Sequence, residues 1–571
     1  MKRLLVYMKG YIKECILGPL FKLLEALFEL FVPLVVAAII DKGIAAGDKP
    51  YIVKMCLVLV LLGFAGLAFS ITAQYFAAKA SVSFVARLRH VLFEHIQKLS
   101  YSELDELGTS TMVTRMTSDM NQVQNGVNLT LRLLLRSPFV VFGAMVMAFT
   151  INAQVAMIFV YVTVLLLIVV FAIMLCSIPL YRKVQQKLDG VTSVTRENLT
   201  GVRVIRAFCK EGEETERFVS RNSELTHSQE FVGRISALMN PVTYIIINLG
   251  IIFLINRGAI NVEQGIITQG AVVALYNYMS QILVELIKLA NLIINITKSI
   301  ACGNRIQAAL EMQPSVTDGK GGSEKGEYAA EFRHAFLKYK NAGDYALSDI
   351  DFTVKKGETV GIIGGTGSGK SSLVNLIPRF YDVCGGNVLV NGVDVKDMAV
   401  SDLRDKIGVV PQKAMLFKGT IRENLLWGNE NASEADIEAA VAAAQALDVI
   451  KAKGGYDCEI EQGGKNLSGG QRQRLTIARA LVRKPEILIL DDSASALDFA
   501  TDAALRKSLR ELDYSPAVFI VSQRTSSILH ADKIIVLDDG KAVGIGTHAE
   551  LLENCEVYKE IYNSQFKKEA V

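Results

Sequence analysis

The sequence lacks the features that mark several classes of protein. Its eight cysteines are scattered, and no two have the CxxC spacing typical of metal and redox sites, so we expect neither a metal site nor a disulfide framework. The net charge is only +3 over 571 residues, which gives no indication of nucleic-acid binding by bulk charge. The first residues lack a short apolar stretch ending in a small-residue cleavage site, so we expect no removable signal peptide.

Long apolar runs are missing from the second half of the chain but recur in the first. Runs of about twenty mostly apolar residues, the length that crosses a bilayer, occur before residue 300 and not after it. The chain is 51 % hydrophobic with a mean hydropathy of +0.31, which is high for a soluble protein. It is also too long for one compact domain. We therefore predict a membrane-embedded half followed by a soluble half.

Six membrane-spanning helices are predicted, at residues 15–40, 52–79, 133–152, 154–180, 238–257 and 270–296. Residues 1–14 mix basic and apolar side chains and predict an amphipathic helix on the membrane surface. Lysine and arginine gather in this segment and in the long connections after the second and fourth spans. The positive-inside rule therefore places both termini and both connections in the cytoplasm.

Charged residues inside the predicted spans are energetically costly and are often functional. Lys22, Glu25 and Glu29 share one face of the first span, and Glu285 and Lys288 are three residues apart in the sixth. Two interpretations remain open. Either the acids face an inner cavity and attract cationic substrates, or Lys22–Glu25 and Glu285–Lys288 are neutralising pairs that leave Glu29 without a local partner.

A phosphate-binding motif follows the predicted strand Thr359–Ile363 in the soluble half. The segment Gly364-Gly-Thr-Gly-Ser-Gly-Lys370-Ser371 matches the pattern G-x-x-x-x-G-K-[ST], and a helical stretch comes after it. Lys370 is expected to neutralise the β- and γ-phosphates of ATP, and Ser371 to bind Mg²⁺. The expected nucleotide contacts in this segment are Gly364, Gly365, Thr366, Gly367, Ser368, Gly369, Lys370, Ser371 and Ser372.

Two further motifs lie downstream of the phosphate loop. The apolar run Ile487–Leu490 ends at Asp491, and an acid at the tip of a buried strand is a usual Mg²⁺ ligand in phosphate-loop domains. The segment Leu467-Ser468-Gly469-Gly470-Gln471 is a turn of small residues before a helix, which suits anion binding.

The order of these motifs after six spans resembles the ABC exporter family over essentially the whole chain, and LSGGQ looks like the signature sequence of ABC ATPases. The resemblance implies an all-α membrane domain of the type I (type IV) exporter fold, followed by an α/β phosphate-loop ATPase. It implies an amphipathic elbow helix at 1–14, a transmembrane domain at 15–312 with two cytoplasmic coupling regions, a linker at 313–326 and a nucleotide-binding domain at 327–571. It places the protein in the cell membrane, with the ATPase domain in the cytoplasm.

The resemblance also assigns roles to residues. Tyr339 resembles the aromatic residue that stacks on adenine, Gln412 the glutamine that contacts Mg²⁺, and Asp498 a residue of the loop that crosses the dimer interface. Segments Ser100–Gly108 and Gly201–Lys210 resemble the two coupling helices. In this family two ATP molecules lie between two ATPase domains, so the resemblance implies a dimer. The residues expected to contact the partner's ATP are Ser468, Gly469, Gly470 and Gln471.

Two positions depart from the family pattern. The residue after the Mg²⁺ aspartate is usually a glutamate that acts as general base, and here it is Asp492. The histidine that usually contacts the γ-phosphate is replaced by Gln523, which cannot carry a positive charge. Together they predict a site that binds ATP but hydrolyses it slowly or not at all. The combination resembles one subunit of the heterodimeric bacterial multidrug exporters, so we predict a different ABC chain as partner, with a homodimer as the alternative.

The transported substrate is predicted only by class, as an amphipathic small molecule. Lipid, peptide or metabolite export remains an alternative, as does an ATP-gated or regulatory ABC protein. The absence of a long regulatory insertion between the two halves argues against the regulatory alternative. Four residues of the sixth span either line a drug cavity or pack between helices: Tyr276, Tyr278, Met279 and Gln281.

Overall fold

The computed structural model describes residues 2–319, 321, 326–340 and 342–566. It divides into two compact units. Unit 1 contains the chain up to Gln97 together with Ser110–Glu311, and unit 2 contains Lys98–Thr109 and the chain from Met312 onward. Part of the predicted linker, residues 320 and 322–325, lies outside the described residues.

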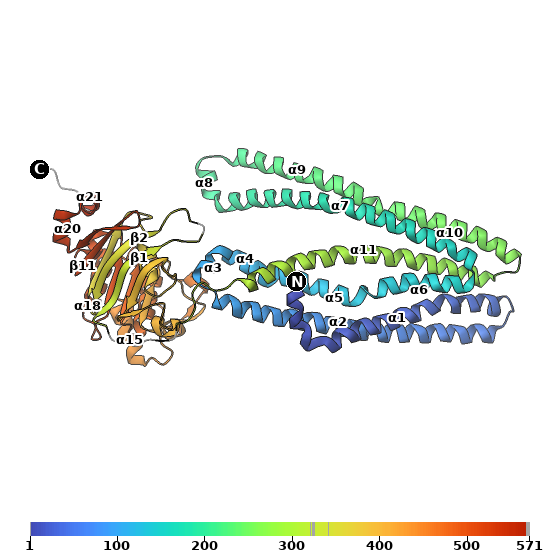
Figure 1. Ribbon diagram of the computed structural model, residues 1–571, viewed down its shortest axis with the longest axis horizontal. Helices are drawn as coiled ribbons and strands as arrows, with labels where there is room; N and C mark the ends of the chain where they lie inside the picture. Colours follow the sequence, from blue (N-terminus) through green and yellow to red (C-terminus); the bar gives the residue numbers. More distant parts are fainter. Residues whose placement is uncertain (1, 320, 322–325, 341, 567–571) are drawn as a thin grey trace. The chain divides into compact units, whose positions relative to one another are not determined.

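The described residues of unit 1 form helices and short connections (Figure 1). Six helical stretches are long and apolar enough to cross a membrane: Arg3–Ile44, Lys49–Lys98, Thr109–Ile151, Ala153–Thr200, Glu211–Glu263 and Gln269–Glu311. These stretches confirm the six predicted spans. Each has at least 42 residues, so at about 1.5 Å per residue each extends well beyond a hydrocarbon core of about 30 Å.

The helices of unit 1 follow one another closely along the chain, and α3, which belongs to unit 2, lies between α2 and α4. They are η1 (Lys2–Tyr11), α1 (Ile12–Ala38), η2 (Ile39–Ile44), α2 (Lys49–Lys98), α3 (Tyr101–Leu107), α4 (Thr109–Thr114), η3 (Arg115–Asp119), α5 (Met120–Leu133), α6 (Arg136–Ile151), α7 (Ala153–Thr200), α8 (Val202–Ala207), α9 (Glu211–Ala237), α10 (Met239–Glu263) and α11 (Gln269–Glu311). In Figure 1, α7 runs beside α9 and α10.

The main core of unit 1 lies where α1, α6, α7, α10 and α11 meet. Small residues such as Ala144 and Ala148 are fully buried there and allow the helices to approach closely. Tyr278 and Met279 are fully buried in the same core, and the Tyr278 hydroxyl donates to the Leu30 carbonyl at 2.6 Å. For Tyr278 and Met279 the packing interpretation is therefore correct, and the cavity interpretation is wrong.

The described residues of unit 2 form three sheets. The largest has the order β12-β11-β3-β10-β9-β6, in which every neighbouring pair is parallel except β11 and β12. An antiparallel sheet has the order β2-β1-β4-β5, and β7 pairs with β8. The strands are β1 (Tyr328–Leu337), β2 (Leu347–Lys355), β3 (Thr359–Gly364), β4 (Gly385–Val390), β5 (Val393–Asp394), β6 (Ile407–Val410), β7 (Gly419–Thr420), β8 (Glu459–Ile460), β9 (Ile487–Asp491), β10 (Ala517–Val521), β11 (Lys533–Asp538) and β12 (Lys541–Gly546).

The strand order brings the predicted motifs to one edge of the large sheet. Strands β3, β10 and β9 are consecutive and parallel, so their carboxyl ends lie side by side, where α/β domains bind their ligands. All residues of β9 and β10 are buried, and all except Asp491 are apolar, as expected for a sheet covered on both faces. The helices of unit 2 beyond α3 are α12 (Lys370–Leu376), α13 (Val400–Asp405), α14 (Ile421–Leu426), α15 (Glu434–Ala443), α16 (Leu447–Ala452), η4 (Gln462–Gly464), α17 (Gly469–Val482), α18 (Phe499–Arg510), α19 (Thr525–Ile528), α20 (His548–Asn554) and α21 (Glu556–Gln565).

Candidate functional site

The predicted phosphate loop connects β3 to α12 and requires glycine at defined positions. Gly367 and Gly369 have φ angles of +87° and +94°, which lie in the region that side chains other than glycine rarely adopt. A Cβ atom on Gly369 would also lie 2.8 Å from the Ala346 carbonyl oxygen. A Cβ atom on Gly364 would lie 2.1 Å from the Leu537 carbonyl oxygen. Glycine at these positions therefore allows the tight shape of the loop.

Lys370 begins α12 and folds back over the loop. Its ammonium group donates to the carbonyl oxygens of Gly364 at 2.9 Å and Gly365 at 2.5 Å. Burial lowers the pKa of Lys370, and the carboxylates of Asp492 and Asp491 partly oppose this shift. The ammonium group also donates to the Ser368 hydroxyl at 3.4 Å. A buried cation whose hydrogen-bond partners are neutral carbonyl and hydroxyl oxygens is suited to a negatively charged phosphate.

Ser371 and Asp491 form the centre of the predicted Mg²⁺ site. The Ser371 hydroxyl donates to a carboxylate oxygen of the buried Asp491 at 3.0 Å. Burial raises the pKa of Asp491, and the bond from Ser371 opposes the shift. In the described part of the chain, no group of three or more His, Cys, Asp or Glu side chains could hold a metal ion alone. One hydroxyl and one carboxylate fit Mg²⁺, which usually takes one or two carboxylates and completes its shell with water and substrate phosphates.

Asp492 and Gln412 lie next to this centre. The Gln412 side-chain amide donates to a carboxylate oxygen of Asp492 at 3.3 Å. Asp492 has a φ of +47°, a left-handed conformation that aspartate tolerates better than most residues. Gln523 lies two residues beyond the end of β10, and its backbone carbonyl accepts from Gln565 at 2.7 Å. The two positions that depart from the family pattern therefore lie beside the predicted Mg²⁺ site.

Tyr339 follows β1 and contacts the phosphate-loop helix. Its hydroxyl is 2.9 Å from the Ser372 hydroxyl, and its ring meets the Tyr381 ring edge to face with centroids 5.0 Å apart. Burial raises the pKa of Tyr339, so the phenol stays neutral at physiological pH.

These side chains border one open cavity of about 320 Å³. Its lining is Tyr339, Ala346, Thr366, Gly367, Gly369, Lys370, Ser371, Ser372, Gln412, Asp491, Asp492, Val521, Ser522 and Gln523. The structure thus brings together residues that the sequence predicted separately for phosphate, Mg²⁺ and adenine. The lining residues Ala346, Val521 and Ser522 were not predicted, because none of them belongs to a motif whose chemistry requires that residue type.

Comparison with known proteins agrees with this geometry. Residues 15–286 match the family described as the ABC transporter transmembrane region, and residues 347–495 match the family described as ABC transporter. An uncharacterised ABC transporter ATP-binding protein of Bacillus subtilis, YfiB, is 35 % identical over 100 % of this chain and 99 % of its own length. The chain belongs to the ABC transporter family.

Other similar proteins extend this result. An ATP-dependent lipid A-core flippase of Syntrophus aciditrophicus is 32 % identical over 85 % of this chain and 81 % of its own length. A solved bacterial Atm1-family ABC exporter with ATP bound has the same fold, with a TM-score of 0.82 and 23 % identity over 98 % of this chain and 100 % of that one. This likeness confirms the predicted exporter fold of six apolar helices followed by an ABC ATPase.

The ABC signature forms the start of α17, away from the cavity described above. The Ser468 hydroxyl accepts from the backbone of Gln471, and the Gln471 side chain accepts from the backbone of Ser468, which caps the helix. A Cβ atom on Gly470 would lie 3.1 Å from the Ala496 carbonyl oxygen, so this residue must stay small. Asp498 caps α18 by accepting from the backbone amide and the hydroxyl of Thr501. None of the signature residues or Asp498 lines the cavity.

The predicted first coupling segment contains the short helix α3, which contacts the ATPase domain within unit 2. The Tyr101 ring stacks on Phe380, with centroids 4.5 Å apart. Asp105 accepts from the Tyr381 hydroxyl at 2.7 Å, and Lys340 pairs with Glu106 at 2.5 Å. Tyr381, which the sequence analysis did not single out, therefore touches both α3 and Tyr339.

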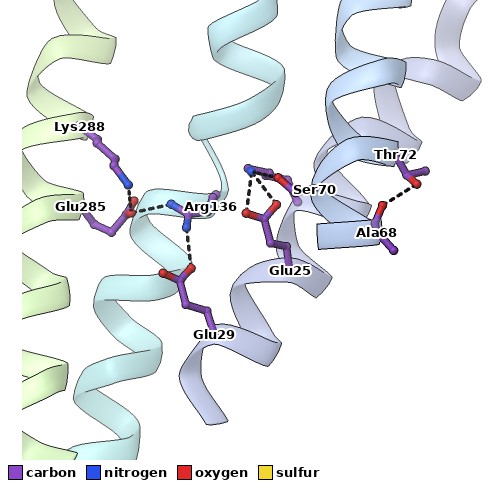
Figure 2. A network of polar contacts seen from close by, with 9 residues as sticks. Glu25, Glu29, Ala68, Ser70, Thr72, Arg136, Glu285 and Lys288 are labelled. Atoms are coloured by element: carbon purple, nitrogen blue, oxygen red, sulfur yellow. Dashed lines mark hydrogen bonds and ion pairs between the residues drawn. The ribbon is translucent and has the colours of Figure 1, made fainter. Parts of the chain in front are cut away.

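The five charged residues that the sequence analysis singled out in the first and sixth spans are paired in unit 1, and Figure 2 shows this network. Lys22 binds Glu25 at 2.5 Å and Lys288 binds Glu285 at 2.8 Å, so both expected intrahelical pairs are present. Glu29 is also paired, because Arg136 of α6 binds it at 2.6 Å. The sequence analysis missed Arg136, although it is a charged residue inside the predicted third span.

Proposed function

We propose that this chain is one subunit of an ATP-driven exporter whose own phosphate-loop site turns over slowly. The observation that carries the proposal is that Asp492 and Gln523 both line the cavity that contains this chain's predicted phosphate, Mg²⁺ and adenine residues. Lys370 binds the β- and γ-phosphates, Tyr339 stacks on the adenine, and Ser371, Gln412 and Asp491 hold Mg²⁺. When bound, Mg²⁺ neutralises charge on the phosphate oxygens.

The slow step in this account is activation of the attacking water. The Asp492 carboxylate is one methylene shorter than that of glutamate, and the Gln412 amide already donates to it. General-base catalysis contributes roughly 10²–10⁴ in rate, and a misplaced base loses much of it. Gln523 can donate a hydrogen bond to the γ-phosphate but adds no positive charge.

The proposed assembly is a heterodimer with a second ABC half-transporter in the cell membrane, with both ATPase domains in the cytoplasm. The intact signature at Ser468–Gln471 completes the ATP site of the partner, where most hydrolysis takes place. ATP binding closes the two ATPase domains, α3 transmits this movement to the spans, and hydrolysis at the partner's site resets them. The substrate is an amphipathic small molecule.

Restoring the usual residues tests the proposal. In the purified complex, Asp492→Glu with Gln523→His is expected to raise ATP hydrolysis several-fold without changing ATP affinity. The matched control, Asp492→Asn with Gln523→Ala, is expected to leave the rate within about twofold, because this site contributes little. Loss of most hydrolysis in the control, or no gain in the restored variant, would contradict a low-turnover site.

A further inference from the structure

Four charged side chains from three membrane helices form one chain of ion pairs (Figure 2). Arg136 of α6 lies in the middle and binds Glu29 of α1 at 2.6 Å and Glu285 of α11 at 2.5 Å. Glu285 also accepts from Lys288 at 2.8 Å and from the Ser137 hydroxyl at 2.8 Å. Two of the four charged groups are positive and two are negative, so the network carries no net charge. It therefore offers no excess negative charge to attract a simple cation.

The middle of this network is buried, and its two ends are open. The side chains of Arg136 and Glu285 are 7 % and 3 % exposed, whereas those of Glu29 and Lys288 are 43 % and 42 % exposed. The open ends therefore have opposite charge. Each end makes one ion pair and keeps capacity for another, since a carboxylate has two acceptor oxygens and an ammonium group three donors.

The charge of the open ends favours a location away from lipid. Ionised side chains within spans almost always face the bundle interior or a water-filled cavity, because their exposure to hydrocarbon is costly. The Arg136 Nε atom and the Gln281 side-chain oxygen, one turn before Glu285, are buried without a hydrogen-bond partner in the described residues. The face shared by α1, α6 and α11 thus has unused polar capacity beside two half-exposed charges.

The network lies inside the membrane part of its three helices, because its four charged residues all fall within predicted spans. Glu29 and Arg136 each lie 15 residues from the end of their helical stretch, and Glu285 lies 16 residues from the start of α11. Asp41, near the end of the first stretch, accepts from Thr268 and from Gly270 at the start of α11, so these ends lie together. At about 1.5 Å per residue, the three residues are about 22–24 Å along their helices from these ends. The charges therefore lie at a similar level in the three helices, away from the helix ends.

We propose that this network binds the headgroup of a zwitterionic amphiphile. The cationic group of the ligand pairs with Glu29 and its anionic group with Lys288. Val284, one turn before Lys288 on α11, is exposed and offers an apolar surface to the chain of the ligand. This inference names the substrate class of the proposed exporter and rests on that proposed function.

Three probes with the same twelve-carbon chain test the charge requirement. They are dodecylphosphocholine, dodecyltrimethylammonium and dodecyl phosphate, used below their micelle concentrations with the complex in phosphatidylglycerol nanodiscs. Equilibrium dialysis measures binding without nucleotide, and ATP hydrolysis is measured separately. The wild-type complex is expected to bind the zwitterion at least tenfold more tightly than either singly charged probe. Phosphocholine without the chain is expected not to compete, which distinguishes an amphiphile from a soluble zwitterion.

Variants of Glu29 and Lys288 test which group of the ligand each open end binds. Glu29→Gln is expected to make the complex bind the zwitterionic probe no more tightly than the anionic probe. Lys288→Gln is expected to make it bind the zwitterionic probe no more tightly than the cationic probe. Both variants leave Arg136 paired with Glu285, so the buried middle is preserved. The control removes a polar pair of the same helix, with Lys22→Met and Glu25→Gln together, and is expected to keep the selectivity.

The outcomes separate this inference from the proposed function. Similar affinity for all three probes, tighter binding of the cation, absence of binding, or unchanged selectivity in both end variants would overturn the zwitterion site. Competition by phosphocholine would contradict an amphiphilic ligand and would indicate that the network binds a soluble zwitterion instead. Each of these results leaves the export proposal standing if the complex still hydrolyses ATP and the restored Asp492 and Gln523 variant gains rate.

Discussion

At the scale of single residues, the phosphate loop shows why one glycine cannot be replaced while its neighbour can. Gly369 has a φ of +94°, and a Cβ atom there would lie 2.8 Å from a backbone oxygen. Gly365 has no positive φ, and a Cβ atom there would meet no atom within 4 Å. Gly365 is also absent from the cavity lining. The same sequence motif therefore contains positions with very different tolerance.

Gly369→Ala is expected to weaken ATP binding at least tenfold. The left-handed conformation costs roughly 1–2 kcal/mol for an alanine, and the contact with the Ala346 carbonyl adds to this cost by moving the loop. Gly365→Ala is the matched control and is expected to keep the wild-type affinity. Equilibrium binding of a fluorescent ATP analogue to the purified complex measures both. Equal affinities for the two variants would show that the loop is not held in the described shape.

At the scale of elements, α3 connects the ATP cavity with the membrane helices along the chain. It follows α2 and precedes α4, both of which carry spans or their extensions, yet its own contacts are with the ATPase domain. Tyr101 stacks on Phe380, which comes shortly after the phosphate-loop helix, and Asp105 bonds Tyr381 beside Tyr339. We therefore expect a shift of the phosphate-loop helix to reach α3 through these contacts.

Tyr101→Ala is expected to reduce the stimulation of ATP hydrolysis by amphiphile several-fold and to leave ATP affinity unchanged. The variant removes a stacked aromatic pair, worth about 0.5–1.5 kcal/mol beyond its buried area, between α3 and the ATPase domain. Ser102→Ala on the same helix is the control, because Tyr101 and not Ser102 makes the ring contact. Stimulation that survives in the Tyr101 variant at its wild-type level would argue that α3 does not couple the two halves through this stack.

The sequence predicted local features well and long-range pairing poorly. The phosphate loop, the acid at the end of β9 and the six apolar stretches depend on short patterns, and the structure contains all of them. Arg136 and Glu29 are 107 residues apart, and Tyr381 and Asp105 are 276 apart, so no periodic pattern connects either pair. Tyr278 and Met279 could not be assigned to core or cavity because both environments favour the same side chains.

At the scale of the whole molecule, one chain contains half of each ATP site. The cavity collects the phosphate loop, Asp491, Asp492 and Gln523, whereas the signature at Ser468–Gln471 caps α17 elsewhere in the same chain. ABC exporters function as dimers, so we expect the signature to act on the ATP of a second chain. The identity of this second chain would decide how the proposed low-turnover site contributes to transport.

The mass of the intact complex tests the central claim most directly. The chain is tagged, purified in mild detergent from cells that contain its native neighbours, and weighed by native mass spectrometry. One copy of this chain with one different ABC half-transporter is the expected result, with ATP held here and hydrolysed mainly at the partner's site. Two copies of this chain and no other protein would contradict the division of labour and would make Asp492 and Gln523 a working catalytic pair.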